Sequence, residues 1–266
     1  DVKFMFLPQE HKLNILLGHE VTDSGGDEIE IDASHFPSNF SKDNAFAMIN
    51  QYDKAAGTSK FFSSVEVPER ILSFFGRANY TLLDRYLFTL TFRADGSSKF
   101  SPDHRWGYFP AAAIGWRLSE EPFMRGTREW LDNLKLRFSY GSVGNDGINS
   151  DLWLQTWTSE TDLRWQYNLG KKYFSSYDLS STEMANKDLK WETTITRNIG
   201  IDFGFFNSRL WGSLDLYWNT TKDLLMLTSL PGITGFTATY DNIGQTSNKG
   251  IELSLSGVVY KDKDWN

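Results

Sequence analysis

Apolar and polar residues alternate with a period of two along much of this chain, and no other feature limits the possible folds as strongly. The clearest case is the segment 209–219. One of its parities is mostly apolar and the other mostly polar: Leu210, Gly212, Leu214, Leu216 and Trp218 against Trp211, Ser213, Asp215, Tyr217 and Asn219. A helix would place Asp215 among the leucines, so we predict a β-strand with one apolar and one polar face.

The same alternation predicts nine strands. They fall at residues 2–6, 13–20, 72–80, 86–93, 106–118, 134–141, 194–205, 209–219 and 251–259. Two residues break the pattern, because Arg197 lies on the apolar parity of its strand and Phe75 lies on a polar one. At Arg197 we expect a β-bulge or a place near a membrane surface, where an arginine costs only about 0–1 kcal/mol. For Phe75 we expect an internal packing partner.

The segments between the predicted strands alternate in length. Short turns are expected at 8–10, 82–84 and 207–208, longer loops at 22–66, 96–105, 145–188 and 222–246, and an intermediate segment at 119–132 with a short helix around 128–131. Short turns at one end and long loops at the other are typical of outer-membrane barrels, whereas a soluble β-sandwich has no reason to sort its loops by end. We therefore predict an all-β antiparallel meander forming part of a transmembrane β-barrel. Its apolar faces would contact lipid, its long loops would be extracellular and its short turns periplasmic.

The composition agrees with a barrel and argues against other classes. The chain has 20 Phe, 11 Tyr and 10 Trp, yet its mean hydropathy is −0.43, as expected where lipid-facing and lumen-facing residues average out. A net charge of −7 argues against a nucleic-acid-binding surface. The absence of cysteine excludes disulfides, thiolate metal sites and a cysteine nucleophile. No apolar run of about 18 residues is present, so no transmembrane helix is expected.

Recognisable motifs occur in order along almost the whole chain. Residues 93–100 match the pattern R-x-D-G-S-S-x-F, and further characteristic segments lie at 106–111, 115–123, 134–145, 191–202, 217–225 and 242–252. Together they resemble the SusC/RagA-type TonB-dependent outer-membrane transporters. The resemblance implies a 22-stranded barrel around a plug, for which nine strands are too few. Residues 1–266 would then be one partial barrel domain, without the plug, the TonB box, the N-terminal domains and the C-terminal strands.

The resemblance also implies a function, which is TonB-energised import of oligosaccharides or oligopeptides across the outer membrane. The implied partners are a SusD-like surface lipoprotein, the TonB–ExbB–ExbD complex acting through the plug, outer-membrane lipid and the substrate; no cofactor is implied. The alternative is a non-transporting β protein, either an outer-membrane barrel enzyme or a secreted glycan-binding β-sandwich. No G-x-S-x-G, Walker A, H-E-x-x-H or Rossmann motif is present, so we expect no enzymatic activity.

The loop 145–188 is unusually rich in aromatic residues and supplies the candidate substrate contacts. These candidates are Trp153, Trp157, Trp165, Tyr167 and Tyr173. Aromatic faces stack on the C–H faces of sugar rings, which would make this a glycan-binding loop. The alternative is that the same residues pack the loop over the barrel rim or form an interfacial girdle.

Charged residues suggest no metal site. An acidic run between Asp23 and Asp32 has no spacing known for a calcium loop, so we interpret it as a solvated charge run. The charged residues on the polar parities are expected to hydrogen-bond the plug or water rather than substrate: Arg93, Arg117, Arg137, Asp202, Asp215 and Glu252.

Overall fold

The fold is described from a computed structural model. The described residues are 11–51, 60–65, 68–160, 167–169, 172–174, 176–179 and 181–258. Contacts divide the chain into two units, one made of residues 22–70 and the other of the remainder. Each unit is treated by itself.

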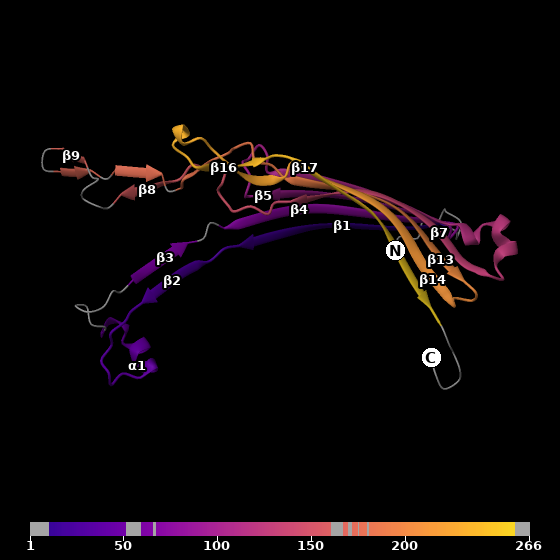
Figure 1. Cartoon of the computed structure of the whole chain (residues 1–266), viewed down its shortest axis with the longest axis horizontal. Helices are drawn as coiled ribbons and strands as arrows, with labels where there is room; N and C mark the ends of the chain where they lie inside the picture. The colour runs from indigo at the N-terminus through magenta and orange to yellow at the C-terminus, as the bar shows by residue number, and fades with distance from the viewer. Residues whose placement is uncertain are drawn as a thin grey trace. The chain divides into compact units, whose positions relative to one another are not determined.

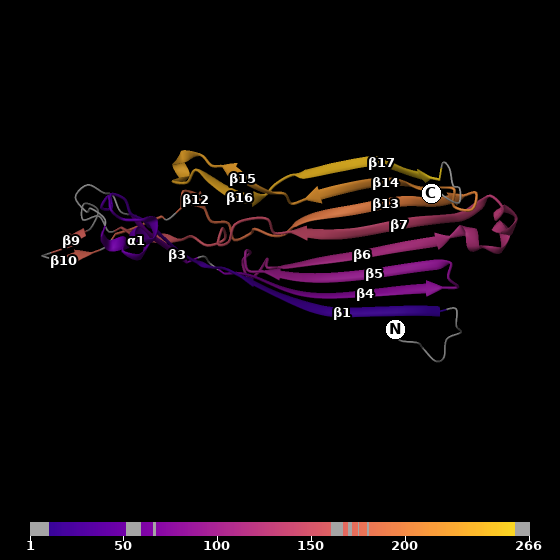
Figure 2. The same cartoon turned by 90° about the horizontal axis from the view of Figure 1, so that it is seen from below.

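A single eight-stranded sheet dominates the larger unit. Its strand order is β1-β4-β5-β6-β7-β13-β14-β17, and the ladders from β4 to β17 are all antiparallel (Figures 1 and 2). The strands are β1 (His11–Ser24), β4 (Glu69–Leu82), β5 (Tyr86–Ser97), β6 (Trp106–Arg117), β7 (Leu131–Asn145), β13 (Glu192–Phe205), β14 (Leu210–Lys222) and β17 (Gln245–Gly257). Since each strand pairs with the next long strand of the chain, the sheet is the predicted meander.

Eight of the nine predicted strands are confirmed, and the ninth, at 2–6, lies outside the described residues. Several strands extend further than the sequence indicates. β17 begins at Gln245, six positions before Ile251, where the apolar alternation starts. The reason is physical, because alternation marks only the stretch with one apolar face, whereas the ladder continues where both faces are polar.

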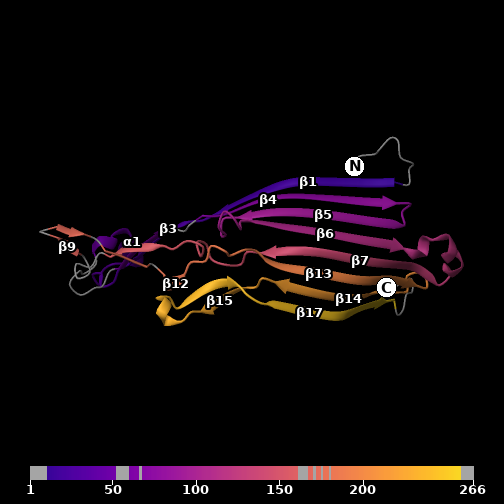
Figure 3. The same cartoon turned by 90° about the horizontal axis from the view of Figure 1, so that it is seen from above.

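The two shortest connections lie at one end of the sheet, as predicted. These turns, at 83–85 and 206–209, share that end with the intermediate segment 118–130, and the connections at 98–105, 146–191 and 223–244 leave from the other end (Figure 3). The helix expected around 128–131 is wrong. Two 3₁₀ segments lie earlier instead, at Leu118–Glu120 and Pro122–Thr127, because Pro122 favours a helix start and Leu131 already pairs with Phe205 in the sheet.

The long loops contain small sheets of their own, which the sequence pattern did not predict. They pair β8 (Trp157–Glu160) with β11 (Ser176–Leu179), β9 (Tyr167–Leu169) with β10 (Lys172–Phe174), and β16 (Ala238–Asn242) with both β12 (Glu183–Met184) and β15 (Leu225–Ser229); a 3₁₀ turn lies at Gly232–Thr234. The smaller unit pairs β2 (Asp27–Asp32) with β3 (Lys60–Val65) and holds a short helix α1 (Lys42–Ala47) and a 3₁₀ turn at Ile49–Gln51. None of the described helices has the length and apolar character needed to cross a membrane.

One face of the main sheet exposes large apolar side chains. Leu17 is 80% exposed, Ile251 72% and Leu253 62%. The strand register sets them in rows, for example Phe138, Ile199, Leu216 and Ile251 side by side on β7, β13, β14 and β17. No second sheet covers this face in the part of the chain that the structure describes. A soluble sandwich would bury such a face, so this alternative is not supported.

The two exceptions to the alternation have different explanations. The register runs without a shift through Arg197, so the expected bulge is absent. Phe75 does have an internal partner, as predicted. Its ring covers Gly18, where an added Cβ would lie 2.5 Å from the ring, and the Arg93 guanidinium carbon lies 5.6 Å from the ring centroid.

We predict that residues 1–266 expressed alone will not form a soluble monomer. The apolar face has no cover, and the edge strands β1 and β17 present unpaired backbone groups. In plain buffer the chain should aggregate, and it should become monodisperse only in detergent, as measured by size-exclusion chromatography with light scattering. A monodisperse monomer with a cooperative melt in buffer would contradict this view of the apolar face.

Candidate functional site

The polar face of the sheet holds a four-residue charge network around Arg137. The Arg137 Nε donates to both carboxylate oxygens of Asp202 at 2.9 and 3.0 Å, and its Nη2 donates to both oxygens of Asp215 at 3.0 Å. Lys135 Nζ lies 3.6 Å from Asp202. Two cations therefore balance two anions on this face.

Gly200 makes this network possible. In the register it lies between Arg137 on β7 and Asp215 on β14. An added Cβ at Gly200 would lie 2.5 Å from Asp215 Oδ1 and 2.7 Å from Arg137 Nη2. Any side chain here would separate the guanidinium from the carboxylate.

A second arginine on the polar face is equally well partnered. Arg93 Nε donates to both oxygens of Asp95 at 2.7 and 2.8 Å, and its Nη2 donates to Ser73 Oγ at 2.9 Å. Glu20 lies 3.4 Å away. Arg93 and Arg137 are therefore held by carboxylates of the sheet itself, and bonding of these charged residues to the plug or water stays a prediction. Arg117 donates to the Asp84 carbonyl at 3.3 Å.

A polar hollow of about 400 Å³, lined mainly by amides and hydroxyls, lies on the loop side of the Arg137 network. It is lined by Ser139, Thr196, Arg197, Asn198, Tyr217, Asn219, Asn248 and Glu252. Ser139, Asn198 and Tyr217 face one another across β7, β13 and β14, next to Gly250 on β17. The absent side chain at Gly250 leaves room for the Tyr217 ring, whose Oη would be 2.6 Å from an added Cβ.

The chemistry of this hollow suits a neutral, hydrogen-bonding ligand. Amides supply both donors and acceptors, hydroxyls supply either, and the tyrosine adds an aromatic face. Apart from Arg197 and Glu252, the sequence pattern did not single out these residues. Their only signal was a set of amides and hydroxyls on polar parities, and they become a group only when the register places four strands side by side.

The bases of three loops meet in a small apolar core. Its buried members are Phe100, Phe109, Ile148, Leu189 and Trp191, with Leu152, Leu225 and Tyr240 packed against them. Trp191 Nε1 donates to the Arg105 carbonyl at 2.9 Å, and Ser101 Oγ donates to the Lys187 carbonyl at 2.7 Å. This loop-base core is what anchors the aromatic-rich loop to the sheet.

The structure separates the predicted substrate-contact residues. Trp157 opens β8 and is 62% exposed, whereas Trp153 is half-buried and its Nε1 atom has no hydrogen-bond partner among the described residues. Tyr167 and Tyr173 lie on the paired strands β9 and β10, and Trp165 lies outside the described residues. Trp153 and Trp157 make no ring contact with each other in the described chain. Their role in binding stays a prediction.

Metal-binding clusters are absent from the described residues. No group of three or more His, Asp or Glu side chains there converges as a metal site would require. Asp27, Glu28, Glu30 and Asp32 of the acidic run lie exposed on β2.

The chain matches the family described as TonB dependent receptor-like, beta-barrel, over residues 10–266. The chain belongs to this family. It is 43% identical over 200 residues to the TonB-dependent receptor SusC of Bacteroides thetaiotaomicron, which covers 74% of the chain and 19% of SusC. Among solved structures, the RagAB peptide importer superposes with a TM-score of 0.82 in its open-open state and 0.81 in its closed-closed state, at 29% and 28% identity. Both superpositions cover 97% of this chain and 26% of the other.

These findings confirm the SusC/RagA resemblance and the barrel-fragment fold. Members of the TonB-dependent receptor family are outer-membrane β-barrel transporters and not enzymes, as the missing catalytic motifs predicted. The chain spans about a fifth of the length of the curated relative it matches.

We predict that the Arg137 network stabilises the receptor that carries this chain. Arg137→Met leaves two carboxylates without their shared cation, so we expect a loss of about 1–3 kcal/mol in the free energy of unfolding. Arg128→Met is the matched control, because Arg128 pairs with Glu120 in an exposed position and should change stability by less than about 0.5 kcal/mol. Thermal unfolding in detergent measures both. Equal losses in the two variants would contradict a stabilising role.

We also predict that the loop-base core, and not the exposed aromatic residues of the loop, gives the loops their resistance to protease. Trp191→Ala removes a side chain that is 9% exposed and should cost about 3–5 kcal/mol locally, so the loops should become sensitive to protease added to intact cells. Trp157→Ala should leave protease resistance unchanged. Equal resistance in the Trp191 variant and the parent would show that this core does not anchor the loops.

Proposed function

We propose that this chain forms part of the wall of an outer-membrane importer for oligosaccharides or oligopeptides. Residues 1–266 would be one partial barrel domain of a longer transporter that also has a plug. The observation that carries this proposal is family membership, combined with a sheet that exposes apolar side chains on one face and pairs charges on the other.

The dimensions of the sheet support a membrane-spanning wall. The stretch of β6 from Tyr108 to Trp116 matches the 9–11 residues that a tilted strand needs to cross a bilayer. Both of its ends carry amphipathic aromatic residues, as expected at the two membrane interfaces. At the turn end, Tyr86 and Trp116 donate hydrogen bonds to Glu121 at 2.7 and 3.0 Å. The apolar face would therefore contact lipid and the polar face would line the lumen.

The polar hollow supports a substrate with many neutral hydrogen-bonding groups. Glycans and peptides both fit, and the RagAB structures to which the chain is similar are those of a peptide importer. The long loops would be extracellular and would supply further contacts through Trp153, Trp157, Trp165, Tyr167 and Tyr173. A SusD-like surface lipoprotein would deliver substrate at this end. The TonB–ExbB–ExbD complex would supply energy through the plug.

Uptake by cells that depend on the complete receptor tests the proposal. The probes are labelled mixtures of oligosaccharides and of oligopeptides. The receptor should import one of these two classes, and this import should require active TonB. Asn198→Ala should reduce uptake up to about tenfold, because it removes donors and acceptors from the hollow. Ser256→Ala is the matched control, since Ser256 lies on the polar face of the sheet, on β17, but outside the hollow. The receptor with this substitution should import normally. Uptake of neither class, or uptake independent of TonB, would overturn the proposal.

A further inference from the structure

On β7, β13, β14 and β17 the apolar face of the sheet changes its chemistry at one row of residues. Tyr140, Arg197, Trp218 and Lys249 lie side by side on β7, β13, β14 and β17. The next row on the turn side is Phe138, Ile199, Leu216 and Ile251, and the next on the loop side is Ser142, Ile195, Thr220 and Ser247. The first row, which we call the cationic row, therefore separates large apolar side chains from mostly small polar ones. Such a sequence is typical of the boundary between hydrocarbon and water.

Both cations of this row lack an acidic partner. Arg197 Nη1 donates to Thr220 Oγ1 at 3.3 Å, and its guanidinium carbon lies 5.8 Å from the centre of the Tyr140 ring. Neither Arg197 nor Lys249 forms an ion pair with a carboxylate among the described residues. On the polar face, by contrast, Arg93 and Arg137 each bind two carboxylates. Among the described residues, Arg197 and Lys249 thus leave uncompensated positive charge on the side where lipid would lie.

The spacing of the two cations suits one anionic group. Arg197 and Lys249 are two strands apart, with Trp218 between them, which corresponds to about 10 Å between their backbones. Both side chains are long enough to turn toward a phosphate held over the indole. Arginine binds phosphate oxygens through its planar fork, and lysine binds them as a point charge.

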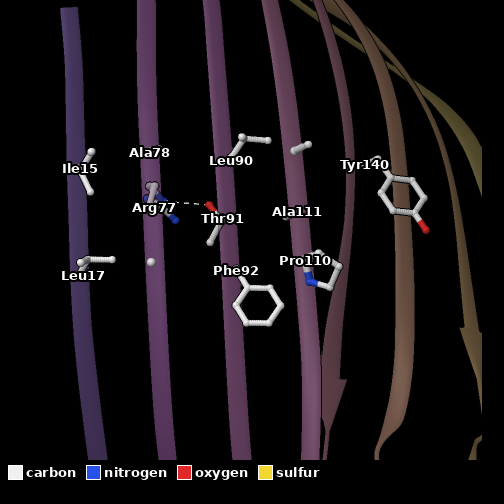
Figure 4. Close-up of a pocket in the computed structure, with 12 residues that line it drawn as sticks. Ile15, Leu17, Arg77, Ala78, Leu90, Thr91, Phe92, Pro110, Ala111 and Tyr140 are labelled. Carbon is white, nitrogen blue, oxygen red and sulfur yellow. Dashed lines mark hydrogen bonds between the residues drawn. The ribbon is translucent and has the colours of Figure 1, made fainter.

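Apolar hollows begin directly beside the cationic row. One of about 320 Å³ is lined chiefly by Ala112, Ile114, Phe138, Tyr140, Arg197, Ile199 and Trp218. It shares Ala112 and Tyr140 with a larger one of about 560 Å³, where Ile15, Leu17, Leu90 and Phe92 surround the small residues Gly76, Ala78 and Ala112 (Figure 4). Together they give a recess on the apolar face, and Arg197 lines the part of it beside β13 and β14.

We propose that this surface binds an anionic, phosphate-bearing membrane lipid. The phosphate lies between Arg197 and Lys249, and an acyl chain fills the recess beside Ile114 and Phe138. A lipid fits better than a peptide, because a peptide segment in the recess would leave backbone groups unsatisfied in hydrocarbon. The inference rests on the proposed function only in requiring that the apolar face meets the membrane.

Lipid binding to the complete receptor in detergent tests the proposal by native mass spectrometry. The probes are phosphatidylglycerol, lipid A, the zwitterionic phosphatidylcholine and inorganic phosphate. The parent receptor should retain the two anionic lipids in preference to phosphatidylcholine and should not retain inorganic phosphate. Arg197→Gln and Lys249→Gln should each weaken this retention about fivefold, the effect of one cation near a charged membrane surface.

Matched variants separate the charge from the recess. Lys222→Gln removes a cation from the same face of β14, two rows further toward the loops, and should leave retention unchanged. Arg197→Lys keeps the charge and should retain most of the preference even if Arg197→Gln folds poorly. Ala112→Phe fills the recess and should weaken retention of anionic lipid while both cations remain.

Equal retention of phosphatidylglycerol by the parent and by the Arg197→Gln/Lys249→Gln variant would overturn the inference. So would a parent receptor that retains phosphatidylcholine equally well, because the cations would then only extend toward water. Uptake by cells that depend on the same receptor variants distinguishes this failure from that of the proposed function. A receptor that imports substrate without any anionic-lipid preference refutes only the lipid site.

Discussion

Backbone hydrogen bonding in a medium without water is the constraint on which the rest of this structure depends. A strand in hydrocarbon must satisfy every N–H and C=O group through its neighbours, and the ladders here run from β4 to β17 with a register shift only between Gly204 and Phe205 in the β13–β7 pair. Because the ladders fix the backbone, each side chain is assigned to one face by its position alone. Leu253 and Glu252 are neighbours in sequence and therefore lie on opposite faces of the sheet, one apolar and one polar.

This assignment makes the polar face a network rather than a scattering of charges. Asp202 and Asp215 lie on different strands and reach the same guanidinium only because Gly200 leaves the space between them open. Lys135 completes a set with no net charge. Pairing of this kind leaves the neighbouring hollow uncharged apart from Glu252 and the edge at Arg197. The surface of this hollow therefore consists mainly of amides and hydroxyls, which suit a neutral ligand better than a charged one.

The sequence predicts the strands well because a strand with one apolar and one polar face must alternate in sequence. The prediction fails where both faces have the same character. The first positions of β17 are polar on both faces, and the short loop strands β8–β12 depend on pairing partners that no local pattern reveals. The helix expected at 128–131 is wrong because Leu131 has a partner in the sheet. For the site, the aromatic loop could be named from composition. The hollow of Ser139, Asn198 and Tyr217 could not, since its members lie on three strands and only the register unites them.

Arg197 shows why register adds information that parity lacks. From parity alone Arg197 is an exception on an apolar face, and a β-bulge is the simplest explanation. In the sheet it lies beside Trp218 and Tyr140, in the one row where aliphatic side chains give way to hydroxyls, so no bulge is needed. Arg137 lies three register positions closer to the turns, on the opposite face of the neighbouring strand. Arg137 forms ion pairs with two carboxylates of its own chain. Arg197 contacts an aromatic ring and a hydroxyl, and neither neutralises its charge. No acid among the described residues lies beside Arg197, and at a lipid boundary the available anions are headgroups, which is the counter-charge that the proposed lipid would supply.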